Sequence, residues 1–150
     1  MNTKRYYRAP LGWMEIQQQG GKVSSLRLVS VKPARGTLLP KSSALFAQLK
    51  SYFQNRKKTF SVPLRVSGTP FQNRVWKALN TVGYGQTVSY AEIARRIGKK
   101  KSVRAVAHAI GQNPCAILVP CHRVIGSDGS LRGYAYGLRK KAWLLEHESC

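Results

Sequence analysis

Acidic residues are scarce in this sequence. Five Asp and Glu residues stand against 26 Lys and Arg residues in a chain of 150, which gives a formal net charge of +21. So large an excess in so short a chain indicates a polyanionic partner, and nucleic acid is the simplest one. An anionic membrane surface, or a lysine-rich surface with no partner, are the alternatives. The charge does not single out one half, because residues 1–68 and 69–150 each hold 13 basic residues.

Long apolar runs are also missing. No run approaches the ~20 residues that a membrane-spanning helix needs. Residues 1–5 lead into alternating polar sequence rather than into the apolar core of a secretion signal. We therefore expect a cytoplasmic protein with no membrane partner, and we expect its cell to be prokaryotic.

Cysteine is rare, since Cys115, Cys121 and Cys150 are the three in the chain. An odd number without an export signal argues against a disulfide framework, so reduced cysteines are expected and one of them is a candidate nucleophile. The hydrophobic fraction of 43% excludes a disordered chain, and 150 residues can bury a core without disulfides.

The first half of the sequence has the pattern of a small α+β unit. Three short strands are predicted, at residues 6–9, 12–17 and 23–31. Gly20 and Gly21 predict a hairpin turn between the last two strands. Residues 41–55 carry apolar side chains at helical spacing and predict one helix.

The second half is mostly helical by its pattern. Four helices are predicted, at residues 70–80, 89–97, 102–112 and 137–148. Thr69 with Gln72, and Ser89 with Glu92, have the spacing of capping boxes, and Ser102 is the expected cap of the third helix. The fold class is therefore α+β, with an antiparallel-sheet domain at residues 1–65 and a mostly helical domain at residues 66–150.

Helices 89–97 and 102–112 have the proportions of a helix-turn-helix. The outer face of the second helix is expected to hold Arg104, Ala105, His108, Ala109, Gly111 and Gln112. Small side chains let a helix approach a narrow groove, which favours the minor groove of DNA with Arg104 inserted. The run Lys99-Lys100-Lys101 at the helix N-terminus would meet phosphates. A helical pair that simply packs, with a solvated lysine run, is the alternative.

Cys121 is the candidate nucleophile, because it follows a buried apolar run and precedes a basic segment. A thiol reacts as thiolate and needs a nearby base or positive charge. His122 is adjacent but can reach the sulfur only through a turn or a bridging water. On the last helix Glu148 and Lys141 share the leucine face, where a carboxylate needs a partner. We expect a Glu148–His122–water–Cys121 relay, with Lys141 near it, that keeps the sulfur partly ionised.

Other interpretations of these residues stay open. A lone cysteine after an apolar run is often only a small buried hydrophobe. A zinc site from Cys115, Cys121, His147 and Cys150 lacks the usual ligand spacing. Gly83-Tyr84-Gly85 is a lone G-x-G, and no nucleotide-binding motif is found. We therefore expect no metal and no cofactor.

The sequence resembles the O6-alkylguanine-DNA alkyltransferase family. The resemblance is strong over residues 69–150 and only in outline over residues 1–65, and the segment from Pro120 to Val124 with its flanks is the most specific part. The matching elements, in the family's order and spacing, are residues 88–94, 104–106, 112–114, 117–125, 133–134, 137–138 and 141–148.

The resemblance implies an RNase H-like N-terminal domain and a monomeric repair enzyme for double-stranded DNA that contains O6-alkylguanine, or O4-alkylthymine. The enzyme would flip the damaged base and take its alkyl group onto Cys121 irreversibly. By residue matching, the catalytic set is Cys121, His122, Glu148, Asn113 and Tyr90. The DNA-binding set is Lys99, Lys100, Lys101, Ser102, Arg104, Ala105, Ala109, Gln112 and Arg123. The substrate pocket is Tyr90, Ile110, Val124, Tyr134, Ala135, Tyr136 and Lys141.

Some positions depart from the family's pattern. No Cys or His precedes His108, so the zinc site that some members have in the N-terminal domain is not expected. Ala135 stands where some members have serine. A non-enzymatic DNA lesion-binding or regulatory module is the competing function. A cysteine hydrolase is a third, but it gives no reason for the positive charge.

Overall fold

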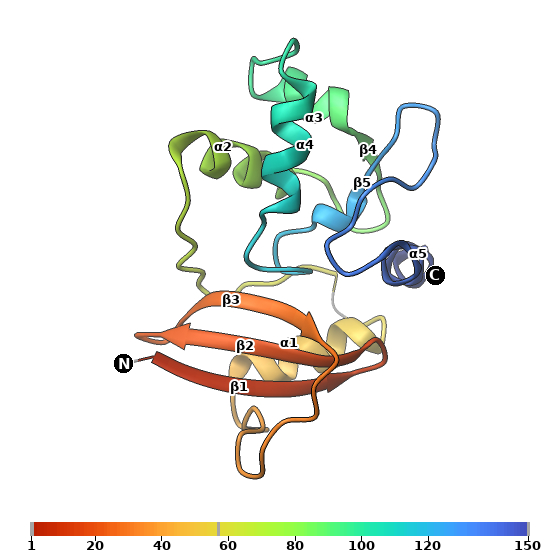
Figure 1. Cartoon of the computed structure of the whole chain (residues 1–150). Coiled ribbons are helices and arrows are strands. Elements are labelled where there is room, and N and C mark those ends of the chain that lie inside the picture. The colour runs from red at the N-terminus through yellow and green to blue at the C-terminus, as the bar shows by residue number, and fades with distance from the viewer. Residues whose placement is uncertain (1, 57, 150) are drawn as a thin grey trace. The chain divides into compact units, whose positions relative to one another are not determined.

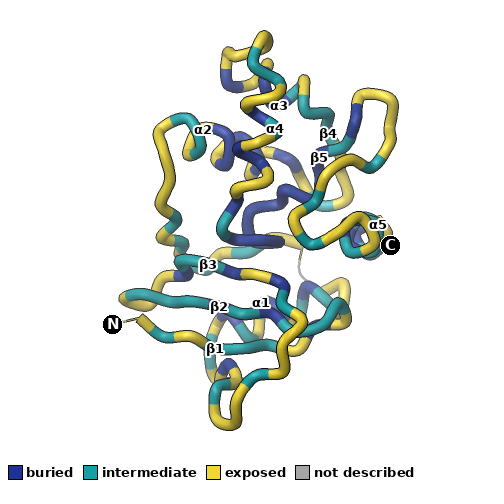
Figure 2. The backbone as a smooth tube through the Cα atoms, in the orientation of Figure 1, coloured by how far each residue is buried: buried dark blue, intermediate teal, exposed yellow. Residues whose placement is uncertain are grey.

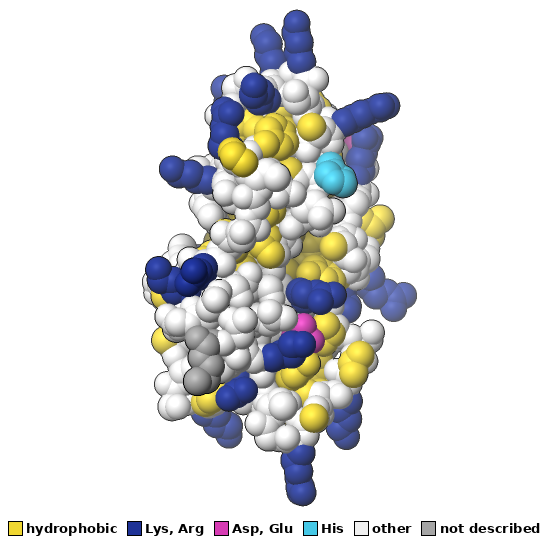
Figure 3. All heavy atoms as spheres, turned by 60° about the vertical axis from the view of Figure 1, so that its left-hand side comes forward, with side chains coloured by type: hydrophobic (Ala, Val, Ile, Leu, Met, Phe, Trp, Pro, Cys, Tyr) yellow, Lys and Arg dark blue, Asp and Glu magenta, His cyan; other side chains and the backbone are white. Residues whose placement is uncertain are grey.

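The computed structural model describes residues 2–56 and 58–149. The chain divides into two compact units, Met1–Val66 and Ser67–Cys150, and each is described by itself. No helix in the described ranges is long and apolar enough to cross a membrane. On the face drawn in Figure 3, Lys and Arg side chains are widely spread and acidic side chains show at few points.

The first unit is an antiparallel sheet with one helix (Figure 1). Strands β1 (Asn2–Ala9), β2 (Gly12–Gln19) and β3 (Lys22–Val29) pair in the order β1-β2-β3. The predicted hairpin turn is confirmed, since Gly20 and Gly21 both have a positive φ, as a two-residue turn of this kind requires. Helix α1 (Ala44–Phe53) packs on the sheet, with the Tyr7 and Phe46 rings 5.3 Å apart.

The core of this unit lies between the sheet and α1 (Figure 2). Met14, Ile16 and Leu26 are buried on one face of the strands, opposite Leu45 and Leu49 of the helix. The prediction of three strands and one helix is confirmed, with different ends. Strand β1 extends to Asn2 because its polar residues pair along β2, and α1 begins at Ala44 because the Ser43 side chain caps it.

The second unit is a group of short helices. They are α2 (Pro70–Leu79), α3 (Tyr90–Arg96), α4 (Val103–Gly111) and α5 (Leu138–Glu148), with a 3-10 turn η1 at Cys121–Arg123. Helix α2 has the complete predicted capping box. The second predicted box forms only by half, because the Glu92 carboxylate binds Arg95 and Arg96 instead of the cap backbone. Ser102 lies at the N-cap of α4 but makes no side-chain cap bond.

Two very short strands bring the site together. Strand β4 (Val88–Ser89) leads directly into α3, and β5 (Val124–Ile125) directly follows η1. The two strands pair in parallel, with Val88 opposite Val124. This ladder holds the start of α3 beside the turn that carries Cys121, although the two segments are far apart in the sequence.

Candidate active site

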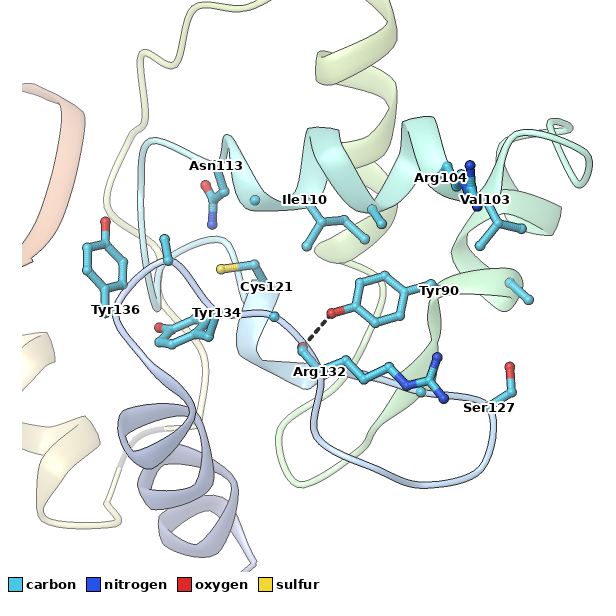
Figure 4. A pocket seen from close by; sticks show the side chains of 16 residues that line it. Tyr90, Val103, Arg104, Ile110, Asn113, Cys121, Ser127, Arg132, Tyr134 and Tyr136 are labelled. Carbon is cyan, nitrogen blue, oxygen red and sulfur yellow. Dashed lines mark hydrogen bonds between the residues drawn. The ribbon is translucent and has the colours of Figure 1, made fainter.

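A cavity of about 430 Å³ opens beside Cys121 in the second unit (Figure 4). Its volume is in the range of small-molecule sites. Of the expected pocket residues, the cavity is lined by Tyr90, Ile110, Tyr134, Ala135 and Tyr136. Asn113, Cys121 and Arg104, expected in other roles, also line it. The lining residues that no sequence pattern indicated as part of a pocket are Ala91, Val103, Ala107, Gly111, Gly126, Ser127, Arg132 and Gly133.

The Cys121 thiol lies in the cavity wall and is nearly covered, with 8% of the residue exposed. Burial raises the pKa of Cys121, while a hydrogen bond from the Asn113 side chain and the positive charge of Lys141 lower it by less. Burial of Cys121 thus favours the protonated thiol in the free protein and argues against the expected partly ionised sulfur. A reaction at this sulfur has to remove that proton when the substrate is in place.

His122 and Glu148 form the expected buried pair. The distance from Nε2 of His122 to Oε2 of Glu148 is 2.7 Å, and both side chains are almost fully buried. Burial lowers the pKa of His122 and outweighs the opposite effect of Glu148, so the ring is neutral near pH 7. The hydrogen of a neutral ring that faces a carboxylate lies on Nε2, which leaves Nδ1 as an acceptor. Among the described residues, no group bonds to this buried Nδ1.

The structure gives Arg123 a different role from the expected one. A DNA contact is expected from the sequence, yet only 9% of the Arg123 side chain is exposed. Nε donates to Oε1 of Glu148 at 2.8 Å, Nη2 donates to Oε2 at 3.0 Å, and Nη1 donates to the Val82 carbonyl at 2.7 Å. Because His122 is neutral, the Glu148 charge needs this second partner. The carboxylate on the apolar face of α5 was the signal for a cationic partner, and the position two residues after Cys121 supplies it.

Lys141 and Val124 do not line the cavity, contrary to expectation. Both are fully buried behind its wall. The Nζ of Lys141 donates to the Arg132 carbonyl at 2.7 Å and to the Gly133 carbonyl at 3.1 Å. Burial lowers the pKa of Lys141 to about 8. Lys141 therefore anchors the loop before α5, and its charge acts on Cys121 only from a distance.

Tyrosines form much of the cavity wall. Tyr90 is the first residue of α3, and its hydroxyl donates to the Arg132 carbonyl at 2.7 Å. The Tyr134 and Tyr136 rings pack edge to face, 5.5 Å apart. Burial raises the pKa of Tyr134 well above its usual value, so its hydroxyl stays neutral. Flat aromatic walls of this kind suit a planar ring as ligand.

Asn113 fixes the segment that leads to Cys121. Its Nδ2 donates to the Val119 carbonyl at 2.8 Å, and its Oδ1 accepts from the Cys115 backbone N–H at 3.0 Å. Ile117, inside this segment, has a φ of 71°, which is rare for a β-branched residue. Such a backbone persists only where surrounding contacts determine it, as the Asn113 side chain does here.

The helix pair α3–α4 presents a thin outer face. Arg104, Ala105, His108, Gly111 and Gln112 are exposed, and Ser102 is half-buried. Ala109, expected on this face, is instead buried, because α2 packs there and Nε1 of Trp76 donates to the Ala109 carbonyl at 2.8 Å.

The lysines of the turn complete this face. Lys99, Lys100 and Lys101 are all exposed, and they lie between the end of α3 and the start of α4. Arg104 lies one turn further on, where it both belongs to the outer face and lines the cavity. The exposed lysines of the turn are therefore followed, one helical turn later, by an arginine that lines the cavity.

A metal centre is not assembled in the part of the chain that the structure describes, since no three His, Cys, Asp or Glu side chains gather there. Cys150, one of the four residues of the zinc alternative, lies outside the described residues. Cys115 is buried and does not line the cavity.

Sequence comparison finds relatives along nearly the whole chain. Residues 70–150 match the family described as 6-O-methylguanine DNA methyltransferase, DNA binding domain. The methylated-DNA–protein-cysteine methyltransferase of Mycobacterium tuberculosis (strain ATCC 25618 / H37Rv) is 44% identical over 145 residues, which cover 93% of this chain and 88% of that protein. A protein of the same name from Methanosarcina acetivorans is 53% identical over 104 residues, covering 69% of this chain and 67% of that protein.

Solved structures agree with the sequence matches. The Mycobacterium tuberculosis O6-methylguanine methyltransferase superposes with a TM-score of 0.88 at 44% identity, over 99% of this chain and 93% of that one. The crystal structure of Mycobacterium tuberculosis OGT in complex with DNA gives a TM-score of 0.90 at 43% identity, over 98% of this chain and 92% of that one.

Proposed function

The chain belongs to the O6-methylguanine DNA methyltransferase family, and we propose that Cys121 is the residue that accepts the alkyl group. The function is direct-reversal DNA repair by alkyl transfer, and the partner is DNA. O6-alkylguanine in double-stranded DNA is the proposed substrate, O4-alkylthymine is a second one, and the monomer is the proposed active form. The proposed location is the cytoplasm of a prokaryotic cell.

The transfer follows from the site's groups. The Cys121 sulfur attacks the alkyl carbon on O6, an S–C bond forms, and the C–O bond breaks with its electron pair moving to the guanine. Nδ1 of neutral His122 receives the thiol proton through a bridging water, while Glu148 holds the ring and stabilises its charged form. The Tyr90 hydroxyl delivers a proton to the purine, which makes guanine the better leaving group, and the proton that His122 received returns to Tyr90 through water, so that the net change moves one proton from the thiol to the guanine. The thioether is stable, so each molecule reacts once.

The base has to leave the duplex to reach this sulfur, because Cys121 is buried in a cavity wall. The extruded guanine would lie between the tyrosine walls, with the Tyr90 hydroxyl turning from the Arg132 carbonyl toward its ring. Arg104 would fill the gap in the stack from α4, and Lys99, Lys100 and Lys101 would bind phosphates. Asn113 would keep the Cys121 segment in place.

One observation carries the proposal. A buried thiol lies in the wall of a cavity with aromatic sides, and the next residue in the chain is a buried histidine whose Nε2 binds a carboxylate and whose Nδ1 has no partner among the described residues. A DNA-binding module without chemistry has no need of this arrangement.

Incubation with a duplex that contains O6-methylguanine tests the proposal. We expect the intact protein to gain the mass of one methyl group, the duplex to lose it, and the reaction to stop at one equivalent. Cys121→Ala is expected to bind the duplex and gain no mass. Binding by the wild-type chain with no gain in mass would support the non-enzymatic lesion-binding module, and repeated turnover would support a hydrolase.

A further inference from the structure

The rim of the cavity carries a second arginine that the proposed mechanism does not use. Arg132 lines the cavity together with Arg104, and 62% of its side chain is exposed. Figure 4 shows Arg104 on α4 and Arg132 on the loop before α5, with Tyr90 between them. The two guanidinium groups therefore belong to different walls of the same opening.

The backbone carbonyl of Arg132 is held firmly, whereas its guanidinium group is held weakly. Its carbonyl accepts from the Tyr90 hydroxyl and from Nζ of Lys141, both at 2.7 Å. Its Nε donates to Oγ of Ser130 at 3.0 Å, and Nη2 donates to Oδ2 of Asp128 at 3.2 Å. An arginine has five N–H donors, so most of them remain for a ligand.

Asp128 keeps the guanidinium folded back over its own loop. The Ser130 hydroxyl and its backbone N–H both donate to Oδ1 of Asp128, which fixes the carboxylate. These bonds lower the pKa of Asp128 to about 2, so it stays charged near neutral pH. A Cβ at Gly126 would lie 2.8 Å from Nε of Arg132, so the glycine makes room for this arrangement. An exposed pair of this kind exchanges partners at little cost.

We propose that Arg132 binds a backbone phosphate that flanks the extruded nucleotide, and that Asp128 holds its guanidinium at the rim until DNA replaces the carboxylate. The inference rests on the proposed function. When a nucleotide rotates out of the duplex, its base enters the cavity but its two phosphates stay at the mouth. An exposed guanidinium there matches a phosphate in charge and in the geometry of its paired donors.

Binding of a lesion duplex as a function of salt tests this role. All proteins carry Cys121→Ala, so that no reaction intervenes. Arg132→Gln is compared with Arg139→Gln, which removes the same charge from an exposed position on α5 outside the cavity. We expect Arg132→Gln to weaken binding about fivefold more than the control and to lower the slope of log K against log salt by about one. Equal effects of the two variants would overturn the proposal.

A phosphate-free substrate separates a DNA contact from damage to the cavity. With Cys121 intact, Arg132→Gln is expected to slow methyl transfer from the duplex more than transfer from the free base O6-methylguanine, and to keep the wild-type melting temperature. A parallel decrease with the free base would assign Arg132 a structural role and overturn the proposal. If the wild-type chain transfers nothing from either substrate, the proposed function fails, and the binding comparison, which needs no chemistry, still decides the role of Arg132.

A double-mutant comparison tests the exchange. Asp128→Asn is expected to tighten duplex binding two- to threefold, and this gain should vanish in an Arg132→Gln background because the two residues act through the same phosphate. A gain that persists without Arg132 would show that Asp128 only repels DNA, and it would contradict the exchange.

Discussion

Two of the carboxylates in the second unit, Glu148 and Asp128, bind the arginines Arg123 and Arg132, and the two pairs differ in burial. Glu148 and Arg123 have side chains that are 1% and 9% exposed, whereas Asp128 and Arg132 are both 62% exposed. The buried pair also holds His122 and cannot change partners without leaving a charge uncompensated. The exposed pair can exchange its carboxylate for another anion. A carboxylate–arginine pair is thus a fixed part of the active site in one place and an exchangeable contact at the DNA-facing rim of the cavity in the other.

The largest expected effect comes from breaking the buried pair. Glu148→Gln leaves the Arg123 guanidinium without its counter-charge and should lower the free energy of unfolding by about 3–5 kcal/mol. Asp128→Asn is the matched control and should leave the unfolding free energy unchanged within error, because exposed pairs contribute little. Urea denaturation of the three proteins measures this contrast. Equal decreases for both variants would contradict the distinction between a fixed and an exchangeable pair.

The DNA-facing side is tested next by Arg104→Ala. We expect transfer from a duplex to slow about tenfold or more, because opening a base out of the stack costs a few kcal/mol that Arg104 would otherwise offset. Transfer from the free base should decrease less than transfer from the duplex, and the free energy of unfolding should stay at the wild-type value, since Arg104 is exposed. Single-turnover kinetics with both substrates measures the ratio, and a ratio unchanged from wild type would remove Arg104 from the flipping step.

A smaller effect is expected from the lysine turn. Replacing Lys99, Lys100 and Lys101 by glutamine should weaken duplex binding and lower the salt slope by up to about three, one for each phosphate that is no longer neutralised. Replacing the three exposed residues Lys32, Lys41 and Arg35 by glutamine removes the same charge from the first unit. Fluorescence titrations at several salt concentrations compare the two triple variants. An equal slope change in both would show that only net charge matters.

The smallest effect is the pH dependence of the buried site. Burial lowers the pKa of His122, so the unfolded chain takes up a proton before the folded one as the pH falls. The free energy of unfolding should therefore decrease below the usual histidine pKa of about 6.5 and stay level just above it. His122→Asn should remove this slope, and the exposed His108→Asn should keep it. Urea denaturation between pH 5 and pH 8 reports the outcome, and an unchanged slope in His122→Asn would refute the assignment.

At higher pH the thiol acts in the opposite direction. The raised pKa of Cys121 means that the folded protein keeps a proton that the unfolded chain loses, so this thiol lowers stability above its usual pKa, whereas Lys141, whose pKa is lowered to about 8, raises stability over the same range. Cys121→Ala should remove the contribution of the thiol and make the free energy of unfolding rise more steeply with pH. The lowered pKa values of Glu92 and Asp128 act only in acid, below the range in which His122 titrates.

Features that depend on the spacing of nearby residues could be predicted from the sequence. The spacing on α5 placed Glu148 and Lys141 on its buried face, and the capping box of α2 follows from Thr69 and Gln72. The pairing of His122 with Glu148 was also predictable, because a carboxylate on an apolar face needs a partner nearby.

Features that depend on neighbours in space were not predictable. Arg123 has the sequence context of a DNA contact, and only the fold shows that Glu148 and the Val82 carbonyl take up its donors. Ala109 follows the outer-face pattern of α4, but packing of Trp76 from α2 covers it. The rim arginine Arg132 lies in a loop without periodicity, so no pattern related it to the cavity.

Mapping of the transferred group tests the central claim most directly. Trypsin is expected to release residues 105–123 as one peptide, since no Lys or Arg lies between Arg104 and Arg123, and this peptide carries both Cys115 and Cys121. Both cysteines are buried, but only Cys121 lines the cavity. After reaction with a duplex that contains O6-methylguanine, fragment ions should place one methyl group on Cys121 and none on Cys115. A methyl group on Cys115, or an unmodified peptide beside a repaired duplex, would contradict the account.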